Sequence, residues 1–103
     1  CGAQFAVLFD ETSLEVRHWN NDGIVEDIAT GSAAGTIGAY RLKHRLAKAG
    51  ETFILNQGQF TGRPSQLRVR AEGNSRSIAS VLVGGDVALV GSGRLDVRPA
   101  FPA

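Results

Sequence analysis

The chain has 103 residues, of which 43% are apolar and 20% charged, with 11 basic and 10 acidic side chains. This length suits one domain, and the composition excludes a disordered, fibrous or membrane-spanning chain. Charges of both signs are interspersed, so the sequence lacks the basic surface with which proteins bind nucleic acids. We therefore expect one cytoplasmic domain, residues 1–103, that binds neither nucleic acid nor membrane.

Cysteine and histidine are too scarce for a disulfide or a metal site. The chain holds one cysteine and two histidines, whereas metal sites need clusters of Cys, His or carboxylate. We expect no metal and no cofactor. The chain also lacks methionine and opens on Cys1, so we expect that some upstream sequence has been removed.

The first predicted elements are two antiparallel strands, at residues 5–9 and 14–19, joined by a polar hairpin connection. A cluster of Asn, Asp and Gly at 20–23 then predicts a turn and a loop that ends near Asp27. Residues 32–49 contain no proline and precede Gly50, which predicts a helix that ends at this glycine.

The N-terminal half of this predicted helix is unusual because residues 33–39 are nearly all small. Its two glycines each lower helix stability by about 1 kcal/mol relative to alanine. Small side chains on several sides indicate that other elements approach closely, so we expect strands to wrap this half. The basic residues near the other end, including Arg41, are expected to be solvated and to complement the helix dipole.

The remaining predicted elements are strands at 52–56, 66–72, 77–83, 87–90 and 95–97. In 66–72, apolar Leu67, Val69 and Ala71 alternate with polar residues, which is typical of a half-buried strand. Two strands, one helix and then a β-meander predict an α+β fold. We expect a curved, mostly antiparallel sheet around one central helix.

Two motifs resemble signatures of a known family. Residues 26–35 read EDIATGSAAG and residues 57–65 read QGQFTGRPS. They are similar to the E-D-P-x-T-G-S-A and Q-G-x-x-x-G-R-P-S signatures of PhzF-like isomerases of phenazine biosynthesis, with Ile28 in place of the proline. The resemblance runs from about Phe5 to Val97. It implies the C-terminal lobe alone of a two-lobed protein with the diaminopimelate-epimerase fold.

The first motif also predicts a site from its own chemistry. Thr30, Gly31 and Ser32 lie where the helix is expected to begin, and the free backbone amides of a helix start bind carboxylate or phosphate. Asp27 lies just ahead and can present an acid to such an anion. A purely structural alternative is that Thr30 or Ser32 caps the helix while Asp27 interacts with its dipole.

The resemblance assigns roles to these residues. It implies that Asp27 donates or shuttles a proton and that the amides of Gly31 and Ser32 hold the substrate carboxylate. A glutamate of the other lobe would remove a proton next to that carboxylate. Related amino-acid epimerases carry cysteine where this chain has Thr30, which disfavours a two-thiol mechanism, and Cys1 is too far along the chain to replace that thiol.

Three arrangements follow, because no second acid-plus-glycine pattern in the chain supplies the missing base. A homodimer can place two helix starts and two Asp27 carboxylates across one cleft and act as a cofactor-independent isomerase. The same dimer can bind a small carboxylate without turnover. Alternatively, the chain is a fragment whose missing lobe is supplied by another polypeptide or was lost.

Overall fold

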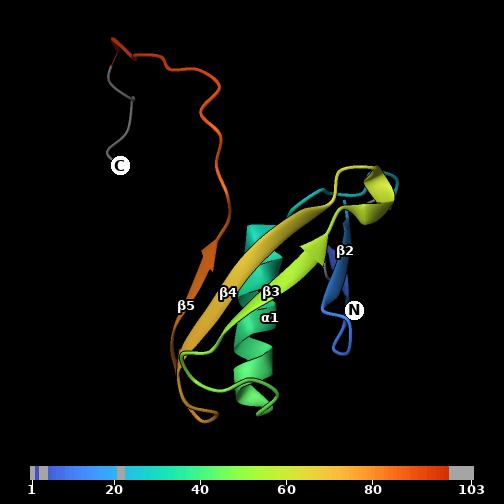
Figure 1. Ribbon diagram of the computed structural model, residues 1–103, viewed down its shortest axis with the longest axis vertical. Helices are drawn as coiled ribbons and strands as arrows, with labels where there is room; N and C mark the ends of the chain where they lie inside the picture. The colour runs from blue at the N-terminus through green and yellow to red at the C-terminus, as the bar shows by residue number, and fades with distance from the viewer. Residues whose placement is uncertain (1, 3–4, 21–22, 98–103) are drawn as a thin grey trace.

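The computed structural model describes residues 2, 5–20 and 23–97, in which one helix packs against a curled five-stranded sheet (Figure 1). Cys1, residues 3–4, residues 21–22 of the predicted turn and the tail 98–103 lie outside the described residues. The elements are β1 (Ala6–Asp10), β2 (Glu15–Trp19), α1 (Gly31–Lys43), β3 (Thr52–Gln57), the 3₁₀ turn η1 (Gln59–Thr61), β4 (Ser65–Gly73) and β5 (Ile78–Gly84).

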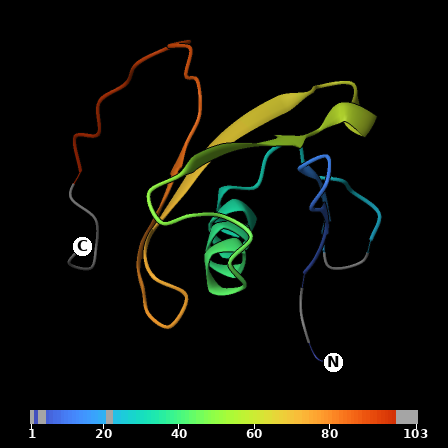
Figure 2. The ribbon, with the colours of Figure 1, turned by 60° about the horizontal axis from the view of Figure 1, so that its bottom comes forward.

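The sheet runs in the order β1-β2-β3-β4-β5, and every neighbouring pair is antiparallel except β2 and β3. Figure 2 shows the β3–β4–β5 sheet curling over α1 with the β1–β2 hairpin standing apart. The predicted α+β class, with a curved and mostly antiparallel sheet around one helix, is confirmed.

The core lies between α1 and the concave face of the sheet. In β3 and β4 every second side chain is buried, as the alternating pattern predicted for β4, and these side chains meet the inner side of the helix. The buried cluster consists of Val16, Ala34, Ile37, Phe53, Leu55, Leu67 and Val69. Val16 brings the β1–β2 hairpin into the same core.

The small residues of α1 allow the closest contacts in this core. A Cβ atom added to Gly38 would lie 2.6 Å from Cγ1 of Val69 and 3.1 Å from Cγ1 of Val81. At Gly35, the nearest such atom, Cγ2 of Val83, is 3.8 Å away, which is an ordinary contact. The prediction that strands wrap the N-terminal half of the helix is thereby confirmed, and β4 and β5 are those strands.

The helix ends at Lys43, six residues before the predicted end. Arg45 adopts a left-handed φ of 59°, and the N–H groups of Leu46 and Ala47 both turn back to the carbonyl of Arg41. The left-handed conformation predicted for Gly50 is present, with φ of 77°, but it belongs to the next turn.

The prediction of a solvated Arg41 is wrong. This residue is 7% exposed, and its guanidinium lies 4.2 Å from the centre of the Phe53 ring. Its Nε donates to Glu11 at 3.0 Å, and its Nη2 donates to the carbonyl of Leu46 at 3.2 Å. The guanidinium therefore joins the end of α1 to the β1–β2 hairpin and holds the turn that ends the helix. The sequence alone does not predict this role, because the alkyl part of an arginine side chain can cover apolar surface much as leucine does.

We expect Glu11→Gln to lower the free energy of unfolding by about 1 kcal/mol, because it leaves the buried Arg41 without its counter-ion. Urea unfolding followed by circular dichroism measures this change. The matched control is Asp86→Asn, whose exposed pair with Arg68 is screened by solvent and should leave the unfolding midpoint unchanged. Equal effects of the two substitutions would contradict the structural role given to Arg41.

The last two predicted strands, at 87–90 and 95–97, are wrong for the described chain. Residues 86–97, here called the arm, leave the end of β5 and run away from the sheet (Figure 1). Its five large apolar side chains, Val87, Leu89, Val90, Leu95 and Val97, are 83% to 97% exposed. A strand needs a neighbour for its backbone hydrogen bonds, and the described residues offer the arm none.

Among the described residues, no helix is both long enough and apolar enough to cross a membrane.

Candidate functional site

The segment before α1 is held against β2 like a short extra strand. Glu26 forms an isolated antiparallel bridge with Trp19, and the Asp27 N–H donates to the carbonyl of His18 at 2.8 Å. Arg17 donates two hydrogen bonds to the Glu26 carboxylate, from Nη2 to Oε1 at 2.6 Å and from Nε to Oε2 at 3.2 Å. The backbone of Asp27 is therefore positioned by β2.

Arg17 also links this segment to the second motif. Its guanidinium lies 4.7 Å from the centre of the Trp19 ring and 3.9 Å from that of Phe60 in η1. The hydrogen bonds to Glu26 raise the pKa of this guanidinium, so it stays charged and attracted to both rings. The residue thus ties β2, the Glu26 loop and η1 together.

The Asp27 carboxylate accepts two hydrogen bonds. Its Oδ1 accepts from the N–H of Ile28 at 2.9 Å, and its Oδ2 accepts from the hydroxyl of Thr30 at 2.6 Å. Asp27 is exposed, and its carboxylate contacts Thr30, the residue just before the helix. Asp27 is thereby fixed beside the start of α1 while remaining open to solvent.

The start of α1 has no side-chain cap. Thr30 occupies the N-cap position in an extended conformation, but its hydroxyl donates to Asp27 and accepts no amide hydrogen of the helix. Ser32 is already inside the helix, and both it and Gly31 are exposed. The capping alternative for Thr30 and Ser32 is therefore wrong, and the helix start is left to solvent or to a ligand.

Gln57, at the end of β3, was missed as a site residue. It is 1% exposed, its Oε1 accepts from the N–H of Thr30 at 3.0 Å, and its Nε2 donates to the Thr30 hydroxyl at 2.9 Å and to the Asp27 carbonyl at 3.2 Å. One buried amide therefore orients Thr30, whose hydroxyl orients Asp27. The available signal was its place as the first residue of the second motif.

The glycines of the second motif let its backbone lie close to the first motif. Gly58 and Gly62 both adopt left-handed φ values, of 89° and 78°, around η1. A Cβ atom at Gly58 would lie 2.8 Å from the carbonyl oxygen of Ile28 in the first motif. The tight turn lets the backbone of η1 approach the Asp27 loop. Arg63 helps to close this turn through its backbone N–H, which donates to the carbonyl of Gly58 at 3.2 Å.

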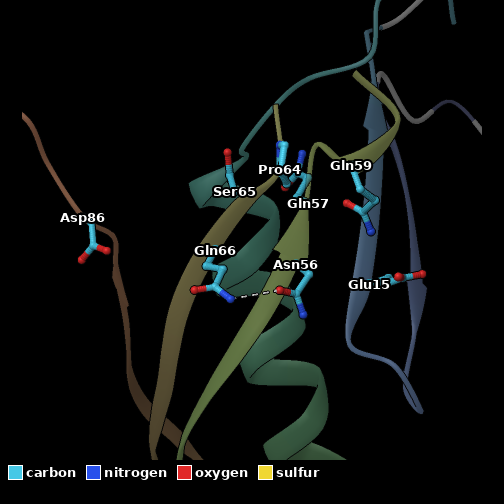
Figure 3. A pocket seen from close by; sticks show the side chains of 8 residues that line it. All are labelled: Glu15, Asn56, Gln57, Gln59, Pro64, Ser65, Gln66 and Asp86. Atoms are coloured by element: carbon cyan, nitrogen blue, oxygen red, sulfur yellow. Dashed lines mark hydrogen bonds between the residues drawn. The ribbon is translucent and has the colours of Figure 1, made fainter. Parts of the chain in front are cut away.

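A hollow borders the end of β3 (Figure 3). It encloses about 640 Å³ and is lined by Glu15, Asn56, Gln57, Gln59, Pro64, Ser65, Gln66 and Asp86. Asn56 and Gln66 alternate with residues that face α1, so they point to the opposite face of the sheet, where they meet in a 3.4 Å hydrogen bond. Gln57 lines the hollow and also bonds Thr30, so the hollow adjoins the helix start. We place the candidate site at the helix start because Asp27, Gly31 and Ser32 do not line the hollow.

The candidate site combines an uncapped helix start with an acid beside it. The described residues contain no group of three His, Cys, Asp or Glu side chains that could hold a metal ion. What the helix start offers is a pair of exposed residues, Gly31 and Ser32, at the positive end of the dipole, with Asp27 a few residues away. Such an arrangement can bind a carboxylate and exchange a proton with it or with its neighbouring carbon.

The family model of phenazine biosynthesis-like proteins, PhzC-PhzF, matches residues 4–93. The chain belongs to this PhzF-like family. Among its relatives, a trans-2,3-dihydro-3-hydroxyanthranilate isomerase of Pseudomonas aeruginosa is 39% identical, over 76% of this chain and 30% of that protein. An isomerase of the same description from Pseudomonas chlororaphis is 38% identical, over 71% of this chain and 26% of that protein.

A solved structure supports the same assignment. A predicted epimerase of Pseudomonas aeruginosa is 44% identical, with a TM-score of 0.74, over 94% of this chain and 33% of that chain. The PhzF-like chain described here therefore spans about one third or less of the length of these relatives.

Proposed function

We propose that this PhzF-like lobe binds a small carboxylate at the start of α1, through the amides of Gly31 and Ser32, with Asp27 as the proton donor or shuttle. The observation that carries the proposal is the uncapped helix start beside a carboxylate that Thr30 and Gln57 hold in place. The buried Gln57 amide orients Thr30, and the Thr30 hydroxyl orients the exposed Asp27 carboxylate. Helix capping alone does not explain this arrangement, because the threonine at the N-cap position bonds the acid and not a helix amide.

Turnover in this proposal needs a second lobe. Proton transfer between two carbons of a substrate requires an acid and a base that both reach it, and this chain supplies one such group at the site. A second copy of the chain can supply another Asp27, and two carboxylates in one cleft favour one protonated and one ionised form. An isomerase of this kind needs no metal and no cofactor.

The second candidate function is binding of a small carboxylate without turnover. The exposed position of Asp27 favours it, because the described lobe does not exclude water from the site. In this case the lobe acts as an anion-binding module with the same contacts at Gly31 and Ser32.

The test uses trans-2,3-dihydro-3-hydroxyanthranilate, the compound named in the description of the relatives, as the probe. We expect its titration to shift the amide NMR signals of Gly31 and Ser32 most. Asp27→Asn should abolish isomerisation while changing affinity by less than about tenfold, because the amides and not the acid hold the carboxylate.

The matched control is Asp86→Asn, which removes an exposed carboxylate that has no contact with Asp27 or the helix start and should change neither quantity. Binding by the unchanged chain without isomerisation would favour the binding module. Shifts centred on Asn56 and Gln66 would show that the hollow is the binding site and would contradict the proposal.

A further inference from the structure

The hollow at the end of β3 has a polar lining whose charged members are acidic. It lies where β2, β3, η1 and β4 come together (Figure 3). Among the described residues, its lining combines carboxylates and side-chain amides with one proline and one serine, and it includes no lysine, arginine or histidine. Such a lining favours a cation and disfavours the carboxylate that we propose for the helix start. The carboxylates belong to Glu15 and Asp86, and the amides to Asn56, Gln57, Gln59 and Gln66.

Backbone pairing holds three of these side chains in a row on the outer face of the sheet. Glu15 lies opposite Asn56 across the seam between β2 and β3, and Asn56 lies opposite Gln66 across β3 and β4. Residues at opposite positions of neighbouring strands point to the same face. The adjacent residues Gln57 and Leu67 are buried on the other face. The row of one carboxylate and two amides is therefore set by the register of three strands.

The row has oxygen atoms that are free to accept hydrogen bonds. The Glu15 carboxylate forms no hydrogen bond or ion pair with another described residue. Asn56 Oδ1 accepts one hydrogen bond, from Nε2 of Gln66 at 3.4 Å, and each amide oxygen has two lone pairs. Oε1 of Gln66 accepts no hydrogen bond from the described residues. The row therefore offers a charged acceptor beside two neutral ones.

Two arginines lie two positions along the strands from this row, and both are already paired. Arg17 donates to Glu26, and Arg68 donates to Asp86 at 3.0 Å. The pair with Arg68 balances the charge of Asp86. Glu15 is thus the carboxylate of the hollow that remains for a ligand.

Gln59 adds an amide that has no partner in the described chain. Its side chain lines the hollow, yet both Nε2 and Oε1 are shielded from solvent and bond no described group. Folded proteins leave few such groups, because a covered donor or acceptor without a partner is unfavourable. Gln59 opens η1 between the left-handed residues Gly58 and Gly62, which fix its backbone beside the hollow.

We propose that the hollow binds a small organic cation of the guanidinium kind. Glu15 supplies the opposite charge, and the amide oxygens of Asn56 and Gln66 accept N–H groups of the ligand. A rotation of the Gln59 side chain brings its amide into the hollow, where it gains a partner. Neighbouring strands lie about 4.8 Å apart, so acceptors on several strands suit the broad, planar set of N–H groups of a guanidinium better than an ammonium.

This site goes beyond the proposed function, because its ligand differs in charge from the carboxylate expected at the helix start. The two sites still share one side chain, since Gln57 lines the hollow and bonds Thr30.

An NMR titration of the unchanged chain with methylguanidinium chloride tests the proposal. We expect saturable shifts of the side-chain amide signals of Asn56, Gln59 and Gln66. N-Methylurea, which has nearly the same shape but no charge, should leave these signals in place, as should sodium chloride at equal concentration. Methylammonium chloride should bind several times more weakly. Absence of saturable shifts at the three amides would overturn the proposal, as would equal binding of N-methylurea or of methylammonium.

A pair of carboxylate variants tests the role of Glu15. Glu15→Gln should weaken the binding of methylguanidinium about fivefold, which is the effect of losing one exposed charged contact. The matched control is Glu72→Gln, which removes a carboxylate from the same face of the sheet but outside the hollow and should leave binding unchanged. Circular dichroism verifies the fold of both variants. Equal effects of the two substitutions would overturn the proposal.

Gln59→Leu separates a ligand contact from a structural role. Leucine has a similar size but lacks the unpartnered amide, so the midpoint of urea unfolding should stay or rise while methylguanidinium binds several times more weakly. A lower midpoint would show that the amide has a partner within the folded chain, and unchanged binding would show that it does not contact the ligand. Either result would overturn the proposal. None of these outcomes decides whether Gly31 and Ser32 bind a carboxylate.

Discussion

Gln57→Ala is expected to lower the free energy of unfolding by about 3 kcal/mol, because it leaves buried polar groups unpaired. The Gln57 amide serves the N–H and hydroxyl of Thr30 and the carbonyl of Asp27, and the side chain lies in the core at 1% exposure. These three groups connect β3 to the segment before α1. Their loss should therefore weaken the packing of the helix start as well as the stability of the domain.

Urea unfolding measures the change, and two variants control it. Gln66→Ala removes an exposed amide with one long contact to Asn56 and should change stability by less than about 0.5 kcal/mol. Gln57→Glu keeps the shape and the acceptor oxygen but replaces the donor by a second oxygen facing the Asp27 carbonyl. It should destabilise the protein nearly as much as alanine. A stable Gln57→Glu variant would show that the donated hydrogen bonds matter little.

Two glycines of α1 should respond to alanine in opposite directions. Gly38→Ala is expected to destabilise the domain by about 1 to 2 kcal/mol, because the added methyl group would lie 2.6 Å from Val69. Gly35→Ala should stabilise it by up to about 1 kcal/mol, since alanine favours the helix and meets Val83 at an ordinary distance of 3.8 Å.

Each variant controls for the other, because the residue change and the helix are the same. Thermal or urea unfolding of the pair should give stability changes of opposite sign. Two stabilised variants would mean that β4 and β5 can move away from α1 without loss, and the wrapping of the helix would then be looser than the contacts indicate.

The regular parts of the fold could be predicted from the sequence because their signals are local. Alternation of apolar and polar side chains located β4 within about one residue, and the run of small residues indicated a wrapped helix. The end of α1 was missed because residues 44–49 favour a helix by propensity. The turn there depends on Arg41, whose contacts with Glu11 and Phe53 come from elements distant in sequence.

The candidate site shows the same division. Asp27, Thr30, Gly31 and Ser32 lie within six residues of one another, so a motif can predict them together. Gln57 lies 27 residues beyond Thr30 and resembles an ordinary strand residue until the fold places its amide under the helix start. The two final strands were predicted because short apolar runs follow glycine turns there, and the described chain contains no neighbouring strand with which they pair.

The parallel contact between β2 and β3 joins only Glu15 to Asn56 and Val16 to Gln57. With so short a seam, the β1–β2 hairpin is expected to open locally more often than the β3–β4–β5 sheet, with loss of the Leu14–Asn56 hydrogen bond and the Arg41–Glu11 contact. Asp27 follows the hairpin, whereas Gln57 lies at the end of β3. Amide hydrogen exchange should therefore be faster in β2 than in β4, and each opening would carry the acid away from the helix start.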